Sequence, residues 1–189
     1  MRILVAYASR HGATRGIAEH IAGTLERSGL EVTLRSVEKA DAIDAFDAFV
    51  VGSSAYMGGW LSDATAFVRR HRDLLARRPV WLFSSGPVGT ETVDAKGRDQ
   101  LKAAEPKEFA EFARTIQPRE QRVFFGAYDP DAAPAGLAEG LMARFMRIAP
   151  AVRQALPTGD FRDWPAIEAW AAGIVHELAP IEATTDLRV

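Results

Sequence analysis

The residues whose chemistry is easiest to interpret lie near the N-terminus, where Ser9, Gly12 and Thr14 separate an apolar run from a helical pattern. The two hydroxyls can each donate a hydrogen bond, and the glycine lets the backbone turn sharply. Amides at the start of a helix lack partners inside the helix and lie at the positive end of its dipole. These groups predict a phosphate site, to which Arg10 and His11 add positive charge. A serine turn that only caps a helix is the simpler alternative.

The type of phosphate ligand depends on the pattern of the turn. Neither the G-x-G-x-x-G of dinucleotide sites nor the lysine-containing loop of NTPases is present. The pattern Tyr7-x-Ser9-x-x-Gly12-x-Thr14-x-x-x-Ala18-x-x-Ile21 instead resembles the phosphate loop of the flavodoxin-like family, in which hydroxyls and amides surround the phosphate of FMN. The resemblance implies FMN as the cofactor and a first binding segment made of Ser9, Arg10, His11, Gly12, Ala13 and Thr14.

Strands and helices alternate along the rest of the chain. Expected strands cover 3–7, 31–37, 46–52, 80–84 and 123–127, and expected helices begin near residues 13, 62, 106 and 164. The second helix is expected to have its cap at Ser62-Asp63 and to end before Pro79, and a polar connection is expected over 90–106. The residues of the third helix expected to face the core are Phe109, Phe112, Ala113 and Ile116. The segment 31–37 alternates polar and apolar residues, which is typical of an edge strand, whereas the other strands have the apolar character of strands buried on both faces. This alternation predicts an α/β fold with a parallel sheet wound on both faces. The resemblance implies a flavodoxin-like three-layer sandwich of five strands in the order 2-1-3-4-5.

In such a sheet the loops after the first, third and fourth strands converge at the carboxyl ends of the strands. The second of these loops offers glycines for close approach to a flat ring, and Tyr56, Met57 and Trp60 for stacking, although Trp60 could instead fold back onto the core. The third loop has no aromatic residue, which would leave one face of a flavin open to a substrate. The binding residues expected in these two loops are Ser54, Ala55, Tyr56, Met57, Gly58, Gly59, Trp60, Ser85, Gly86, Pro87, Val88 and Gly89.

Composition excludes several classes of function. The net charge of −2 argues against a nucleic-acid-binding protein. The absence of cysteine excludes disulfides, thiolate catalysis and iron–sulfur clusters, so an organic cofactor must carry any electrons. The histidines His20, His71 and His176 lack metal-ligand spacing, and we expect no metal site. No Ser–His–Asp arrangement or carboxylate pair converges on this end of the sheet, and no catalytic side chain is identified.

Four segments in order narrow the resemblance: Ser9–Arg15, Val51–Trp60, Gly140–Ile148 and Asp160–Trp170. Together they resemble the flavodoxin-domain group that contains menaquinone-dependent protoporphyrinogen oxidase. The resemblance implies an FMN-dependent oxidoreductase with an organic electron donor, for which protoporphyrinogen IX is the candidate, and a quinone or similar acceptor. In that oxidase the equivalent of the stretch 128–136 is rich in aromatic and basic residues, whereas here it reads Tyr-Asp-Pro-Asp-Ala-Ala-Pro-Ala-Gly, which leaves the donor open. The alternative function is that of a flavodoxin-type electron carrier that docks to protein redox partners.

The remaining expectations concern domain organisation and location. We expect a single domain over 1–189, with an inserted segment at about 128–160 before the last helix. Residues 137–153 have the pattern of a basic amphipathic helix, which could pack on the core, on a second copy in a homodimer, or on an anionic membrane. The N-terminus lacks a signal-peptide pattern, which predicts a cytoplasmic protein, peripheral to the inner face of the membrane if 137–153 contacts it.

Overall fold

The structure is a computed structural model that describes residues 1–129 and 158–179 of the 189-residue chain. The helix predicted at 137–153, and most of the insertion predicted at about 128–160, lie outside the described residues.

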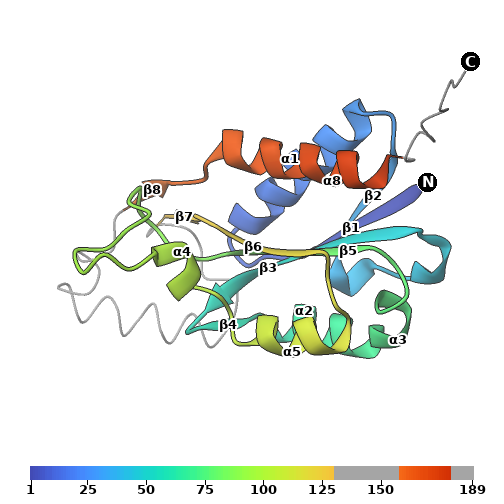
Figure 1. The fold of residues 1–189 in the computed structure, drawn as a ribbon, viewed down its shortest axis with the longest axis horizontal. Coiled ribbons are helices and arrows are strands. Elements are labelled where there is room, and N and C mark those ends of the chain that lie inside the picture. Colours follow the sequence, from blue (N-terminus) through green and yellow to red (C-terminus); the bar gives the residue numbers. More distant parts are fainter. Residues whose placement is uncertain (130–157, 180–189) are drawn as a thin grey trace, which may run out of the picture.

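A parallel sheet forms the middle layer of the molecule (Figure 1). In the described part of the chain, five parallel strands follow the order β2-β1-β3-β5-β6, and a short β4 pairs antiparallel with the end of β3. The strands of this sheet are β1 (Arg2–Ala8), β2 (Glu31–Ser36), β3 (Ala48–Tyr56), β4 (Gly59–Trp60), β5 (Val80–Ser85) and β6 (Glu120–Phe124). Counted over the parallel strands alone, the predicted order 2-1-3-4-5 is confirmed. A separate antiparallel pair consists of β7 (Ala127–Tyr128) and β8 (Gly159–Asp160).

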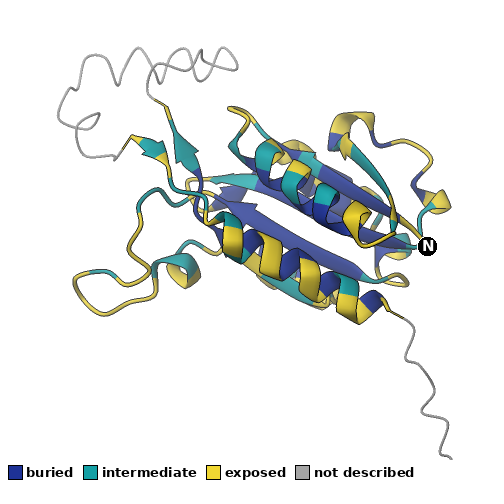
Figure 2. Cartoon of the chain, turned by 90° about the horizontal axis from the view of Figure 1, so that it is seen from above, coloured by how far each residue is buried: buried dark blue, intermediate teal, exposed yellow. Residues whose placement is uncertain are grey.

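Helices cover both faces of this sheet (Figure 1). The face above the sheet in Figure 1 carries α1 (Ala13–Arg27) and α8 (Trp164–Leu178), which run side by side over the strands in Figure 2. The opposite face carries α2 (Ser62–Arg70), α3 (Arg72–Leu75) and α5 (Glu108–Thr115). The remaining short helices of the described residues are η1 (Val37–Lys39), η2 (Ile43–Ala45) and α4 (Gln100–Ala103). The three-layer sandwich expected from the sequence is confirmed.

Each face of the sheet has its own apolar core. Ile17, Ile21 and Leu25 of α1 are fully buried against the same face as the indole of Trp170 in α8. Phe67, Phe112 and other side chains of α2, α3 and α5 form the second core on the opposite face. Burial of large apolar side chains on both sides supplies the main free energy of folding and fixes the sheet between the helices. The central strands β1, β3 and β5 are correspondingly the most buried part of the molecule (Figure 2).

The link between β1 and α1 follows its predicted form. Gly12 has a φ of 86°, a left-handed conformation that glycine adopts without strain, and it immediately precedes the helix. At the other end, Gly29 has a φ of 83°, and its amide donates to the Glu26 carbonyl at 2.9 Å. The turn between strand and helix is therefore fixed by backbone geometry, directly after the carboxyl end of β1.

The structure corrects four details of the sequence-based prediction. The loop expected at 53–60 is a β-hairpin, because β3 continues to Tyr56 and pairs with β4. The helix expected from residue 62 to Pro79 is interrupted at His71, and its start has no side-chain cap. The last strand covers Glu120–Phe124 rather than 123–127. Ala113, expected to face the core, is exposed.

Candidate functional site

Three segments meet at the carboxyl ends of β1, β3 and β5, as the sequence predicted. They are residues 9–14, the β3–β4 hairpin with residues 54–60, and residues 85–89. The first and third segments touch through the Thr14 and Ser85 hydroxyls, which lie 2.7 Å apart. The second and third touch at Gly86, where an added Cβ would lie 3.3 Å from Ala55 Cβ. The fold therefore brings the three predicted segments to one end of the sheet.

Thr14, Ser54 and Ser85 form a group that we call the hydroxyl cluster. Ser54 and Ser85 are register partners on neighbouring strands, and both lie on the sheet face that α1 covers. Thr14 is fully buried and Ser85 is 2% exposed. The Ser54 Oγ is also buried, and it has no hydrogen-bond partner within the described part of the chain. Since one hydroxyl of the Thr14–Ser85 pair donates to the other, one hydrogen of that pair remains for a further acceptor.

The start of α1 supplies further donors next to this cluster. No side chain caps the first amides of α1 among the residues that the structure describes. Ser9 Oγ accepts a hydrogen bond from the Gly12 amide at 3.1 Å, which stabilises the turn and leaves the Ser9 hydroxyl hydrogen to donate. Residues 10–12 are exposed, whereas Thr14 lies in the interior. This end of the sheet thus offers surface amides and a deeper layer of hydroxyls, a set of groups that favours an anion with several oxygens.

The β3–β4 hairpin forms the second wall of the site. Met57 and Gly58 occupy its turn with φ values of 49° and 75°, the geometry of a type I′ turn. Two hydrogen bonds hold the hairpin in place. The Lys107 amide donates to the Gly58 carbonyl at 3.0 Å, and the Trp60 amide donates to the buried Glu108 carboxylate at 3.0 Å. The hairpin is therefore anchored to the start of α5.

The three aromatic and sulfur-containing side chains of this hairpin have different environments. The Trp60 ring is 6% exposed and packs against Phe109 and Phe112, with centroid distances of 5.7 and 5.5 Å. The alternative that Trp60 folds back onto the core is thus confirmed, and its ring offers no stacking surface. Tyr56 is 42% exposed and Met57 is 99% exposed. The positive φ of Met57 costs conformational energy. Because the side chain is exposed, no packing within the described chain offsets this cost.

Arg10 connects the first segment to the hairpin. Its guanidinium carbon lies 5.0 Å from the centre of the Tyr56 ring, within the range of a cation–π contact. Arg10 is exposed, so the contact lies on the outer side of the site. Positive charge is therefore held where the first two segments meet, which would favour an anionic ligand there.

The third segment is hydrogen-bonded to Gly126, and through it to Phe161, two residues that were not predicted to belong to the site. The Gly126 amide donates to the Pro87 carbonyl at 2.8 Å, and the Phe161 amide donates to the Gly126 carbonyl at 3.0 Å. A side chain at Gly126 would contact the Gly86 backbone at 3.6 Å, so the two loops lie close together. Gly126, two residues after the end of β6, was the available signal for this contact in the sequence.

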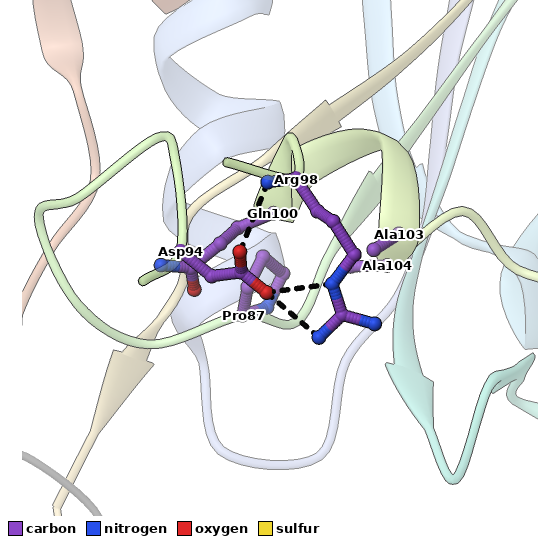
Figure 3. Close-up of a pocket in the computed structure, with 6 residues that line it drawn as sticks. All are labelled: Pro87, Asp94, Arg98, Gln100, Ala103 and Ala104. Carbon is purple, nitrogen blue, oxygen red and sulfur yellow. Dashed lines mark hydrogen bonds and ion pairs between the residues drawn. The ribbon is translucent and has the colours of Figure 1, made fainter. Parts of the chain in front are cut away.

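A pocket of about 340 Å³ lies beside the third segment (Figure 3). Its lining comprises Pro87, Asp94, Arg98, Gln100, Ala103 and Ala104. Asp94 and Arg98 form an ion pair of 2.7 Å across it, and hydrogen bonds from the Arg98 amide and guanidinium lower the pKa of Asp94. Each charge has its counterpart inside the pocket, so the lining as a whole favours a neutral ligand over a polyanion. From the sequence only a polar connection could be predicted over 90–106, because the pairing depends on a turn that returns Arg98 to Asp94.

A parallel α/β sandwich with converging hydroxyl and glycine loops is the architecture of flavodoxin-like proteins. A family model described as a flavodoxin domain matches residues 4–132, which is more than half of the chain. The chain therefore belongs to the flavodoxin domain family.

Solved structures share the fold of this chain. The structure is similar to oxidised flavodoxin 1 from Bacillus cereus, with a TM-score of 0.55 and 14% identity, covering 95% of this chain and 100% of that one. It is also similar to the flavodoxin of Streptococcus pneumonia TIGR4, with a TM-score of 0.53 and 17% identity, covering 94% of this chain and 100% of that one. At these identities the likeness shows the fold alone.

Among curated proteins, the chain is similar to protoporphyrinogen IX dehydrogenase [quinone] of Escherichia coli strain K12. The two are 28% identical over 86 residues, which are 44% of this chain and 48% of that protein. The protein of the same name from Escherichia coli O157:H7 matches with the same figures. The match thus spans about half the length of these relatives. Among the described residues, no helix is both long and apolar enough to cross a bilayer.

Proposed function

We propose that this protein is an FMN-dependent oxidoreductase that passes electrons between an organic donor and a quinone or similar acceptor. The observation that carries the proposal is the hydroxyl cluster next to the uncapped start of α1. In this cluster the Thr14 and Ser85 hydroxyls lie 2.7 Å apart, and Ser54 Oγ is buried without a partner in the described chain. A buried hydroxyl without a partner is unfavourable, and a phosphate oxygen would satisfy it.

The donors at this end of the sheet fit a monophosphate. The Ser9 hydroxyl and the uncapped amides at the start of α1 would bind its outer oxygens, and the hydroxyl cluster would support them from the interior. Arg10 would add a charge at the rim, where it now lies over Tyr56. No lysine is needed, because several amides and hydroxyls share the negative charge.

The hairpin and the third segment fit the ring of a flavin. Tyr56 and Met57 are the side chains that remain exposed for contact with a flat ring, since the Trp60 ring lies in the core. The close approach of Gly86 to Ala55 leaves backbone groups of both loops near the same place. When bound, FMN would supply the transfer of one or two electrons, which the side chains of a cysteine-free chain do not provide. The protein would hold the ring in position and exclude water from one side of it.

The donor and acceptor classes are supported by the likeness to protoporphyrinogen IX dehydrogenase [quinone] over 86 residues. The pocket beside Pro87 is consistent with a neutral acceptor, because the charges of Asp94 and Arg98 neutralise each other there. Protoporphyrinogen IX remains the first donor to examine.

The proposal is tested with purified protein under anaerobic conditions. The bound cofactor is released by denaturation and identified by chromatography and absorbance, and FMN is expected. The holoprotein is then mixed with protoporphyrinogen IX and a soluble menaquinone analogue, and formation of protoporphyrin IX is followed by its fluorescence. Turnover that depends on both the protein and the quinone supports the proposal. FMN binding without turnover, combined with electron transfer only to or from a protein partner, would instead establish the electron-carrier alternative.

A further inference from the structure

A segment from the far end of the chain rests on the phosphate-loop helix. Asp160, Arg162 and Trp164 are alternate residues just before and at the start of α8, so their side chains lie on one side of an extended segment. On α1, Gly16 and His20 lie four residues apart and therefore share one face of the helix. The Trp164 ring contacts the His20 ring at 5.2 Å between centroids.

Arg162 lies at the centre of this contact. Its side chain is only 17% exposed, and Nη1 donates to the Ala13 carbonyl at 3.3 Å, in the first turn of α1. Its guanidinium carbon lies 4.4 Å from the centre of the Trp164 ring. The Asp160 carboxylate accepts from Nε at 2.7 Å and from Nη2 at 2.6 Å. A guanidinium held by three different partners has little freedom to move, which makes it a fixed support.

Gly16 provides the space for this guanidinium. A Cβ at residue 16 would overlap Arg162 Nη1, so any larger residue would force the guanidinium away from α1. Glycine inside a helix costs roughly 1 kcal/mol relative to alanine. The stability lost by having glycine at position 16 is consistent with a need for the Arg162 guanidinium to approach α1 closely at this point.

We infer that Arg162 is a positioning residue for phosphate binding, which holds the first turn of α1 in the place where its amides and Thr14 meet the ligand. This inference rests on the proposed function, because Arg162 would support the same site that is proposed to bind the FMN phosphate. Arg162 contacts the Ala13 carbonyl and not the exposed side of the loop, so it acts through the helix. Asp160 neutralises most of its charge, and the contribution of Arg162 is therefore geometric.

The test compares the affinities of FMN and riboflavin, which share the ring and differ in the phosphate. In the wild-type protein, FMN is expected to bind much more tightly than riboflavin. In Arg162→Ala the FMN affinity should fall by about tenfold, while the riboflavin affinity stays the same. Gly16→Ala should have a similar effect, because the methyl group displaces the guanidinium. The double variant should lose less than the product of the two single losses.

Arg27→Ala is the matched control. Arg27 also ties α1 to α8, through a 3.1 Å ion pair with Glu168, but at the opposite end of α1 from the phosphate loop. Its removal should leave the ratio of FMN to riboflavin affinity unchanged. Amide hydrogen exchange at residues 13–16 gives a second readout and should be faster in Arg162→Ala but not in Arg27→Ala.

Several outcomes would overturn the inference. They include an unchanged FMN-to-riboflavin ratio in both Arg162→Ala and Gly16→Ala, or an equal loss of both flavins. If Arg162→Ala does not fold, Arg162→Lys and Gly16→Ala decide the question by the same ratio. Wild-type protein that binds FMN no better than riboflavin would overturn the proposed phosphate site itself, and the wild-type titration therefore separates the two failures.

Discussion

Thr14 Oγ1 and Ser85 Oγ lie 2.7 Å apart in the interior, although 71 residues separate them along the chain. The contact joins the first turn of α1 to the end of β5, and therefore joins two of the three loops that form the candidate site. Both side chains are almost completely buried. A change in either one is expected to alter the relative position of the two loops and the donors available to an anion.

Thr14→Val keeps the shape of the side chain and removes its hydroxyl. We expect FMN affinity to fall about 10- to 100-fold, because the Thr14 hydroxyl, which would donate to the phosphate or position another donor, is lost. Riboflavin affinity should change little. The free energy of unfolding without flavin should fall by about 1–2 kcal/mol, since Ser85 Oγ loses its partner. Flavin fluorescence titrations and urea denaturation measure the two effects.

Ser84→Ala is the control for this experiment. Ser84 is adjacent to Ser85 but lies on the opposite face of the sheet, where it is fully buried and its Oγ has no partner among the described residues. FMN affinity should be unchanged in this variant. A loss equal to that of Thr14→Val would mean that any change in β5 disturbs the site.

Ser54→Ala should lower FMN affinity without lowering the stability of the flavin-free protein. The Ser54 Oγ is buried and has no partner in the described chain, so its removal should leave the unfolding free energy of the flavin-free protein unchanged or raise it by up to about 1 kcal/mol. FMN affinity should fall, because the same hydroxyl would face a phosphate oxygen. Calorimetric unfolding and binding titrations provide the comparison. A loss of stability in the flavin-free protein would show that Ser54 has a partner of its own.

Gly52 and Gly173 predict opposite effects for the same substitution. A Cβ at Gly52 in β3 would overlap the ring of Phe83, which is fully buried and packed against Phe124 and Trp170. Gly52→Ala should therefore lower the unfolding free energy by about 3 kcal/mol.

Gly173 is exposed to solvent and lies within the length of α8, away from both helix ends, and no atom lies within 4 Å of an added Cβ. Gly173→Ala should raise stability by about 0.5–1 kcal/mol. Urea denaturation of both variants gives the signs directly.

The Asp160–Arg162 pair predicts a defined pH dependence. Hydrogen bonds from Arg162 lower the pKa of Asp160, so the folded state favours the ionised carboxylate. The pair then contributes stability above the pKa of an unfolded aspartate, about 3.9, and loses it as the pH falls through the lower folded value. The difference in stability between wild type and Asp160→Asn should be constant from pH 8 to 5 and should decrease below about pH 4. A difference that changes between pH 5 and 8 would assign the pH dependence to another group.

Local patterns predicted β1, α1 and α8 almost to the residue. Their apolar residues have a clear period, and glycine or aspartate marks the ends: Gly12 before α1, and Asp163, which accepts from the Ala166 amide, before α8. The order of the strands followed from the family resemblance and the handedness of parallel crossovers. The turn at residues 9–14 could be predicted because its groups are neighbours in sequence, and its role in phosphate binding stays a proposal.

The features that were missed depend on partners distant in sequence. The hairpin at 53–60 was not predicted, because Met57 is an unusual residue for a left-handed turn position and the anchors of the turn come from Lys107 and Glu108. From the sequence alone, the Trp60 ring could either stack on a flavin or pack in the core. The choice depends on its contacts with Phe109 and Phe112, which are distant in sequence. Arg162 contacts Ala13 across 149 residues, and no local pattern indicates such a contact.

The central claim is that a flavin is bound through its phosphate between Ser9 and Thr14. Isothermal calorimetry of the wild-type protein, freed of flavin, with FMN and with riboflavin tests it most directly. The account predicts that FMN binds at least about 100-fold more tightly, because only FMN can accept hydrogen bonds from the amides and hydroxyls of this loop. Equal affinities for the two flavins, or no binding of FMN, would contradict it.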